Sequence, residues 1–132
     1  MRILLDTSIL VEGERRNFDL GAWVEKNGHE VLICDATITE YIAGKPVKDA
    51  GKIKRWQDYL DTFVTLIPSV PLDREVCEKA GELMAEARKN GFTVPLGDAY
   101  HAATAVLDDL TIVTVDREHF KAMGLKPVNP LE

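Results

Sequence analysis

Short apolar runs alternate along the chain with longer stretches in which apolar residues recur every three or four positions. The runs ILL at residues 3–5, HEVLIC at 29–34 and LTIVTV at 110–115 are typical of strands buried on both faces of a parallel sheet. The run FVTLI at 63–67 predicts a further strand or an extended segment at the sheet edge. Helices are predicted at residues 18–26, 37–44, 47–60, 72–90, in the alanine-rich stretch that ends at 107, and at 117–123, with a last extended piece around 126–130. Strands that alternate with helices predict an α/β sandwich with a mostly parallel sheet.

Two of the predicted helices have a clear apolar face. The helix at 72–90 carries an apolar stripe made of Val76, Ala80, Leu83, Met84 and Ala87. In the alanine-rich helix, Ala102, Ala103 and Val106 recur at helical spacing, and their small side chains allow close packing. Gly97 is expected to form a tight turn into this helix.

The composition is that of an ordinary globular protein, with 45% hydrophobic and 29% charged residues. There is neither an internal repeat nor a linker, so residues 1–132 are expected to form one domain. Cys34 and Cys77 lie among apolar residues and are expected to be buried free thiols in a reducing compartment. No apolar run approaches the roughly 20 residues of a membrane span, and no signal peptide is expected. The predicted location is the cytoplasm.

The charge is unevenly distributed. The formal net charge is −6, which argues against a nucleic-acid partner. The segment KPVKDAGKIKR at residues 45–55, however, has a net charge of +4. Its basic residues, Lys45, Lys48, Lys52, Lys54 and Arg55, form either a solvated helix face or a local surface for a polyanion.

Four acids fall where the ends of predicted strands and the starts of predicted helices meet. Asp6 and Asp116 each follow a strand directly, Asp98 opens the alanine-rich helix, and Glu40 lies in the helix after HEVLIC. Each has an ordinary structural explanation: Asp6 as a cap of the turn that follows it, Asp98 as a helix N-cap, Glu40 in a capping box with Thr37, and Asp116 as a turn residue. Together they would crowd like charges at one sheet edge, which destabilises a fold unless cations neutralise them.

Divalent cations suit such a cluster, because Mg²⁺ and Mn²⁺ prefer oxygen ligands and Mg²⁺ often takes substrate phosphate as a further ligand. The chemistry that this permits is hydrolysis of a phosphodiester bond by water.

The order of motifs resembles one family over the full length of the chain. The segments LLDTSIL, ITEYIAG, VPLGDAYHAATAV, TIVTVDREHF and GLKPVNP resemble the PIN-domain ribonucleases, and most of all the VapC-type toxins of toxin–antitoxin pairs. The resemblance implies a three-layer α/β/α fold. It also implies that Asp6, Glu40, Asp98 and Asp116 bind Mg²⁺ or Mn²⁺ for RNA cleavage, supported by the hydroxyls of Ser8 and Thr114.

The resemblance further implies a homodimer, a small antitoxin partner, and structured RNA such as tRNA as substrate. The basic segment at 45–55 would hold the RNA backbone, an assignment made from charge alone. His101 stands where the family usually has an aliphatic residue, three residues after Asp98, and is either a packing residue or a group near the phosphate.

Two other functions fit the same residues. Asp6 at the end of the first strand could be the covalent nucleophile of a phosphotransfer domain, but position 8 is Ser where such phosphatases generally carry a second aspartate. The scaffold could also be a non-catalytic binding module, although all four acids are present.

Overall fold

A four-stranded parallel sheet lies at the centre of the molecule, with strand order β3-β2-β1-β4. The computed structural model describes residues 1–132. The strands are β1 (Arg2–Leu5), β2 (Glu30–Cys34), β3 (Ser69–Val70) and β4 (Thr111–Val113). The helices are α1 (Thr7–Glu14), α2 (Leu20–Asn27), α3 (Asp35–Ala43), α4 (Ala50–Thr62), the 3₁₀ helix η1 (Val64–Leu66), α5 (Arg74–Lys89), α6 (Leu96–Leu107) and α7 (Glu118–Ala122).

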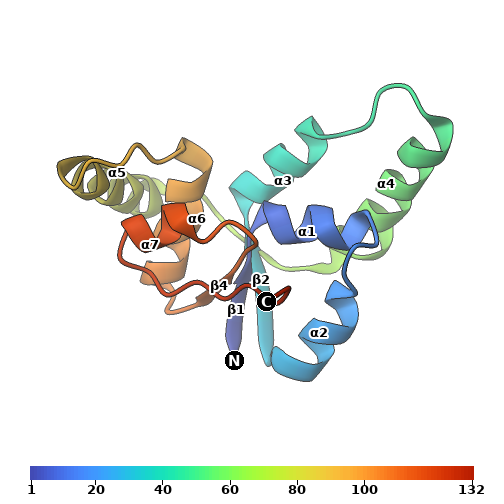
Figure 1. Ribbon diagram of the computed structural model, residues 1–132, viewed down its shortest axis with the longest axis horizontal. Coiled ribbons are helices and arrows are strands. Elements are labelled where there is room, and N and C mark those ends of the chain that lie inside the picture. The colour runs from blue at the N-terminus through green and yellow to red at the C-terminus, as the bar shows by residue number, and fades with distance from the viewer.

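Helices cover both faces of the sheet, which confirms the predicted α/β/α architecture (Figure 1). Strand residues alternate between the two faces. Leu4 and Ile112 point into a core shared with α5, α6 and α7. Ile3 and Leu5 point into the opposite core, which α1, α2 and α4 complete. The central strand β1 is therefore apolar on both sides, as its sequence predicts.

The C-terminal segment extends the sheet. Val128 bridges Val113 in parallel, and its N–H donates to the carbonyl of Ile112. Thr114 in turn donates its N–H to Val128. These bonds hold the residues that follow β4 in place, which matters because two candidate site residues lie there.

The prediction of a strand at 63–67 is wrong. The chain forms η1 there, with Val64 buried and Leu66 74% exposed. Pairing with β2 begins only at Pro68, whose carbonyl accepts the N–H of Ile33 at 3.0 Å. Proline has no N–H and can only accept a hydrogen bond in the ladder, so it is suited to the start of an edge strand. Strand β3 accordingly begins at the next residue, just after the 3₁₀ turn.

Helix α1 at Thr7–Glu14 is not among the helices that the sequence pattern predicts. Two smaller expectations need correction. Cys34 is buried as predicted, but Cys77 is exposed because it lies on the outer side of α5. Val106 is 44% exposed, since the alanines of α6 turn toward α5 and leave it outside the packed face.

The structure contains no helix that combines the length and apolar character needed to cross a membrane.

Candidate active site

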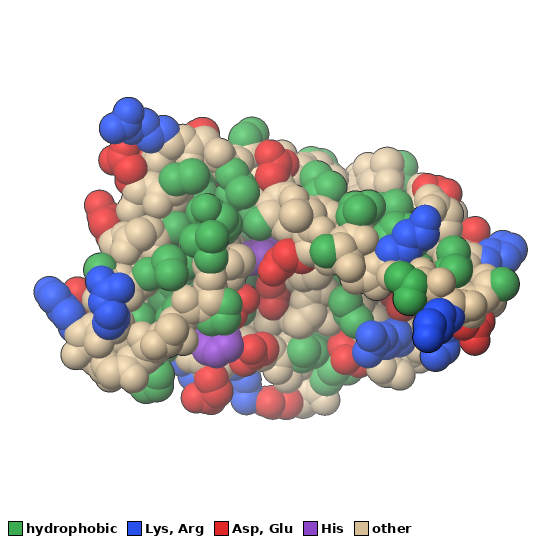
Figure 2. Space-filling view, turned by 90° about the horizontal axis from the view of Figure 1, so that it is seen from above, with side chains coloured by type: hydrophobic (Ala, Val, Ile, Leu, Met, Phe, Trp, Pro, Cys, Tyr) green, Lys and Arg blue, Asp and Glu red, His purple; other side chains and the backbone are tan.

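The sheet topology brings all four predicted acids to the carboxyl edge of the strands. Asp6 follows β1 directly, and Asp116 lies three residues after the end of β4. Glu40 comes from α3, and Asp98 comes from the first turn of α6. Figure 2 looks onto this edge and shows acidic side chains beside histidine at the centre of the face, where the surface is hollowed. Ligands of parallel α/β sheets collect at this position.

Asp6, Glu40 and Asp98 do not cap helices, so the capping explanation for their positions does not apply. Asp6 occupies the N-cap position of α1, but its side chain makes no capping hydrogen bond. Asp98 lies inside α6, whose N-cap is Pro95. Helix α3 starts at Asp35 after the N-cap residue Cys34, so the predicted capping box of Thr37 and Glu40 does not form.

Asp6 is held in one orientation by hydroxyl groups. Its side chain is buried, and its Oδ2 accepts hydrogen bonds from Ser8 Oγ and Thr114 Oγ1, both at 2.8 Å. Thr114 Oγ1 also accepts the N–H of Asp116 at 3.0 Å. These bonds leave Oδ1 of Asp6 facing the other site residues, 3.7 Å from His101 Nε2. Ser8 and Thr114, predicted as supporting residues, both contact this carboxylate.

The surroundings of Asp98 alter its titration. Burial and the charge of Asp6 raise its pKa, while a hydrogen bond from His119 acts in the opposite direction. The side chain is 19% exposed. Oxygen or nitrogen atoms of Asp6, Asp98 and His101 all lie within 4.8 Å of one another, so these three side chains can reach one cation.

His119 forms a second cluster that the sequence did not predict. Its Nδ1 lies 2.6 Å from Asp98 Oδ2 and 3.3 Å from Asp116 Oδ2, and it bridges the two carboxylates. The three side chains could also hold a cation, because one ligand atom of each lies within 4.8 Å of the others. The only signal in the sequence is the spacing of three residues between Asp116 and His119, which places both on one side of a short turn.

Glu40 reaches the site because Gly97 has no side chain. A Cβ at Gly97 would lie 2.5 Å from Glu40 Oε2. Gly97 is therefore not the turn residue that its sequence predicts. It lies within α6, where it makes room for a carboxylate from α3. Glu40 Oε1 accepts a hydrogen bond from Thr7 Oγ1 at 2.6 Å, and Oε2 has no hydrogen-bond donor from the protein.

His101 is a fully buried part of the network behind the acids. Its Nδ1 lies 2.6 Å from the carbonyl oxygen of Gly97, which can only accept, so Nδ1 carries the proton of this bond. Its Nε2 lies 2.6 Å from Thr37 Oγ1 and 3.7 Å from Glu40 Oε1. The histidine thus fixes the backbone at Gly97 and the hydroxyl of Thr37 at once.

No lysine or arginine neutralises the four acids. Histidines are the only basic side chains within 4.0 Å of them. Carboxylate oxygens and imidazole nitrogens that converge without a protein cation are a suitable donor set for Mg²⁺ or Mn²⁺.

The predicted basic residues do not form one surface. Lys52 and Arg55 line a groove of about 550 Å³ that Glu40 also lines. Lys45 does not line the groove, but its Nζ lies 5.4 Å from the centre of the ring of Trp56, which does. Lys54 pairs with Asp58 at 2.6 Å, and Lys48 is exposed outside the groove.

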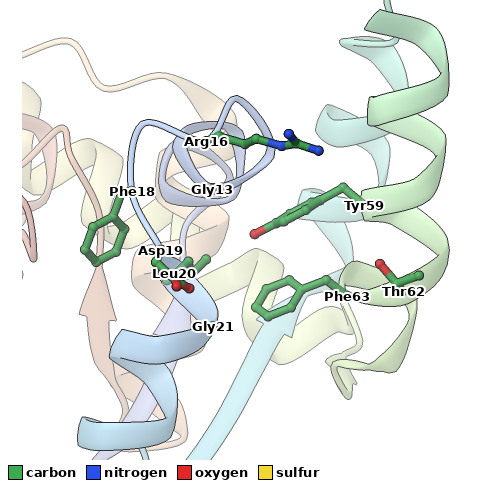
Figure 3. A pocket seen from close by; sticks show the side chains of 9 residues that line it. All are labelled: Gly13, Arg16, Phe18, Asp19, Leu20, Gly21, Tyr59, Thr62 and Phe63. Atoms are coloured by element: carbon green, nitrogen blue, oxygen red, sulfur yellow. The ribbon is translucent and has the colours of Figure 1, made fainter. Parts of the chain in front are cut away.

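A second cavity of about 400 Å³ lies between α4 and the residues around the α1–α2 connection, lined by Gly13, Arg16, Phe18, Asp19, Leu20, Gly21, Tyr59, Thr62 and Phe63 (Figure 3). The hydroxyl of Tyr59 points toward Gly13, and burial raises the pKa of this phenol. None of the predicted site residues lines this cavity.

The fold and the site define a class of α/β/α proteins with an acidic cluster at the carboxyl edge of a parallel sheet. The model of the PIN domain matches residues 3–125, and the chain belongs to the PIN-domain family. It is 32% identical to the VapC ribonuclease Y4jK of Sinorhizobium fredii, over 98% of each chain. It is also 32% identical to the plasmid stability protein StbB of Pseudomonas syringae pv. tomato, over 98% of this chain and 99% of the relative.

Solved structures share the fold at lower identity. VapBC2 from Rickettsia felis, bound to a DNA fragment from their promoter, superposes with a TM-score of 0.82 at 21% identity and 98% coverage of both chains. The resemblance to VapC-type PIN proteins that the motifs indicate is thereby confirmed.

Proposed function

We propose that this protein is an Mg²⁺- or Mn²⁺-dependent endoribonuclease that serves as the toxin of a VapC-type toxin–antitoxin pair. The observation that carries the proposal is the convergence of Asp6, Glu40, Asp98 and Asp116 at one sheet edge without a lysine or arginine to neutralise them. The names of the relatives, which include VapC ribonucleases, support the RNA substrate.

The two less exposed acids are suited to hold the cation. The side chains of Asp6 and Asp98 are 7% and 19% exposed, whereas those of Glu40 and Asp116 are 40% and 50% exposed. Asp6 offers Oδ1, because Ser8 and Thr114 occupy Oδ2. A divalent cation bound there supplies positive charge that polarises a phosphate and makes water more acidic.

The remaining residues orient this arrangement. Thr7 holds one oxygen of Glu40 and leaves Oε2 free to accept a proton from the attacking water. His101 and Thr37 act one layer further back and keep Gly97 and Thr7 in place, since Thr7 Oγ1 lies 3.2 Å from Thr37 Oγ1. His119 positions Asp98 and Asp116 relative to each other.

The proposed partners are a structured RNA such as tRNA, a small antitoxin and a second copy of the chain, and the proposed location is the cytoplasm. The antitoxin is supported by structural neighbours that are VapBC and FitAB complexes.

Cleavage of total cellular RNA by the purified protein in Mn²⁺, with the cut ends mapped by sequencing, tests the proposal. Discrete cuts are expected that disappear in EDTA and fall by at least about a hundredfold in Asp98→Asn. Asp109→Asn is the matched control, because Asp109 precedes β4 at the opposite edge of the sheet.

The alternatives predict different results. An intact protein that binds Mn²⁺ but cuts no RNA would favour the binding module. A phosphoryl group trapped on Asp6 would favour the phosphotransfer domain.

A further inference from the structure

The groove beside Glu40 runs from the acidic cluster to the basic face of α4. Its charged lining residues are Glu14, Arg15, Glu40, Lys52 and Arg55. The volume of about 550 Å³ is in the range of ligand sites. Because Glu40 belongs to both the groove and the acidic cluster, a chain that passes over the cluster can continue into the groove.

The groove presents positive charge from two walls that are distant in sequence. Arg15 comes from the end of α1, and Lys52 comes from α4. Both are exposed, and neither forms an ion pair within the protein. Figure 2 shows lysine and arginine side chains at both ends of the face, and one of these groups lies at the right-hand end, on the side of α4.

Arg55 is fixed but keeps binding capacity. Its Nε donates to the buried carboxylate of Glu14 at 3.1 Å, and its two terminal nitrogens make no hydrogen bond within the protein. Glu14 therefore orients the guanidinium and leaves its two terminal nitrogens available to a ligand. The terminal nitrogens of an arginine suit two oxygens of one phosphate.

The aromatic residues of the groove do not offer a surface for bases. Tyr41 and Trp56 stack on each other with ring centres 5.3 Å apart, and they are 3% and 5% exposed. Bases of single-stranded nucleic acids stack on exposed aromatic faces. A groove with free cations and covered rings is suited to the phosphodiester backbone.

We infer that Arg15, Lys52 and Arg55 form a binding site for the RNA backbone next to the cleaved bond, and that Lys48 and Lys54 lie outside it. The inference rests on the proposed nuclease function, because that function supplies the RNA. It assigns four of the five basic residues of segment 45–55 and adds Arg15, which no charge run in the sequence indicates.

The inference is tested by binding of a fluorescent single-stranded RNA of mixed sequence to the Asp98→Asn protein at several salt concentrations. Added to this background, Arg15→Gln and Lys52→Gln are each expected to lower the slope of log Kd against log salt by about 0.7. That change corresponds to about fivefold weaker binding at about 0.1 M salt. Lys54→Gln is the matched control, because it removes the same charge from the same helix. Native Lys54 pairs with Asp58 and does not line the groove.

A second readout uses the enzyme with its acids intact. Arg15→Gln and Lys52→Gln are expected to raise the KM for RNA about fivefold and to leave kcat within about twofold. If the parent protein cuts RNA and these variants match Lys54→Gln in slope and KM, the groove assignment is wrong. If the parent cuts no RNA, the nuclease proposal fails, and the salt slopes of the binding assay still decide whether the groove holds RNA.

Discussion

Two regions of this molecule each bury a carboxylate to a similar extent. In one region an arginine pairs with the carboxylate, and in the other no lysine or arginine does. Asp6 is 5% exposed and Glu14 is 6% exposed. In the groove, Glu14 is paired with Arg55. At the sheet edge, Asp6 receives two hydroxyl hydrogen bonds and faces another acid, Asp98, with no lysine or arginine nearby.

The difference indicates that the buried carboxylate in the groove has its counter-charge within the protein, whereas the buried carboxylate at the sheet edge does not. A buried carboxylate without a counter-charge costs stability. The groove avoids this cost with an arginine of its own, whereas the sheet edge retains it. Functional sites often lower the stability of a protein in this way. Here a cation bound from solution would neutralise the excess negative charge.

The largest effect is expected where the two regions meet, at Glu40. Gly97→Ala places a methyl group against Glu40 Oε2 and should push that exposed side chain out of the site. Cleavage should fall on the order of a hundredfold, as expected for a misplaced functional group. Unfolding free energy should change by less than about 1 kcal/mol, because alanine is the better helix former.

Gly81→Ala is the control for this change. Gly81 lies in α5 with no atom close to where its Cβ would be. It should gain the same helix propensity and keep full cleavage activity. Equal activity of Gly97→Ala and Gly81→Ala would show that Glu40 has no role at this position.

Removing the charge of Glu14 should destabilise the protein. Glu14→Gln leaves Arg55 without its counter-ion and is expected to lower the unfolding free energy by about 1–2 kcal/mol in urea denaturation. The loss should be measured without divalent cations, so that only the pair is tested. An unchanged stability would mean that the pair contributes nothing and that the two regions do not differ as described.

The same kind of substitution at the sheet edge should have the opposite sign. Asp98→Asn removes a carboxylate that is destabilised by burial and by Asp6, while the amide oxygen still accepts the hydrogen bond of His119. Without divalent cations, the unfolding free energy should rise by about 1 kcal/mol. A loss of stability would contradict the view that like charges are crowded there.

The smallest effect is the pH dependence of this gain. Burial and Asp6 raise the pKa of Asp98 in the folded protein, so the folded state binds this proton more readily than the unfolded state. The ionised group therefore destabilises the fold at neutral pH, and the penalty disappears as the pH falls through the raised pKa. The advantage of Asp98→Asn over the parent should shrink between about pH 7 and about pH 4 in urea denaturation. An advantage that is constant across this range would assign it to another cause.

The sequence predicted the positions of the four acids because a simple rule connects them. Asp6 and Asp116 follow apolar strands, and parallel strands end at one edge. Glu40 and Asp98 lie in the first turns of predicted helices, and the resemblance to a known order of motifs assigns them to the same site as Asp6 and Asp116. By contrast, the contact of His119 with Asp98 spans 21 residues and depends on where α7 packs, which no local pattern encodes.

Two other features depended on helix geometry that the sequence did not make evident. Gly97 has the appearance of a turn residue, but its function is to admit a side chain from another helix. The basic segment 45–55 has the appearance of one patch, but helical periodicity divides it. Lys52 and Arg55 are three residues apart and share the groove, while Lys54 points to Asp58.

The most direct test of a cation site at the sheet edge is the binding of Mn²⁺ to the purified protein, followed by the electron paramagnetic resonance of the free ion. The parent and Glu14→Gln are expected to bind Mn²⁺ with equal affinity, and Asp98→Asn is expected to bind it at least about tenfold more weakly. Bound Mn²⁺ should also raise the melting temperature of the parent and not that of Asp98→Asn. A parent protein that leaves all Mn²⁺ free, or an Asp98→Asn protein that binds it as well as the parent, would show that the acids at the sheet edge are not a cation site.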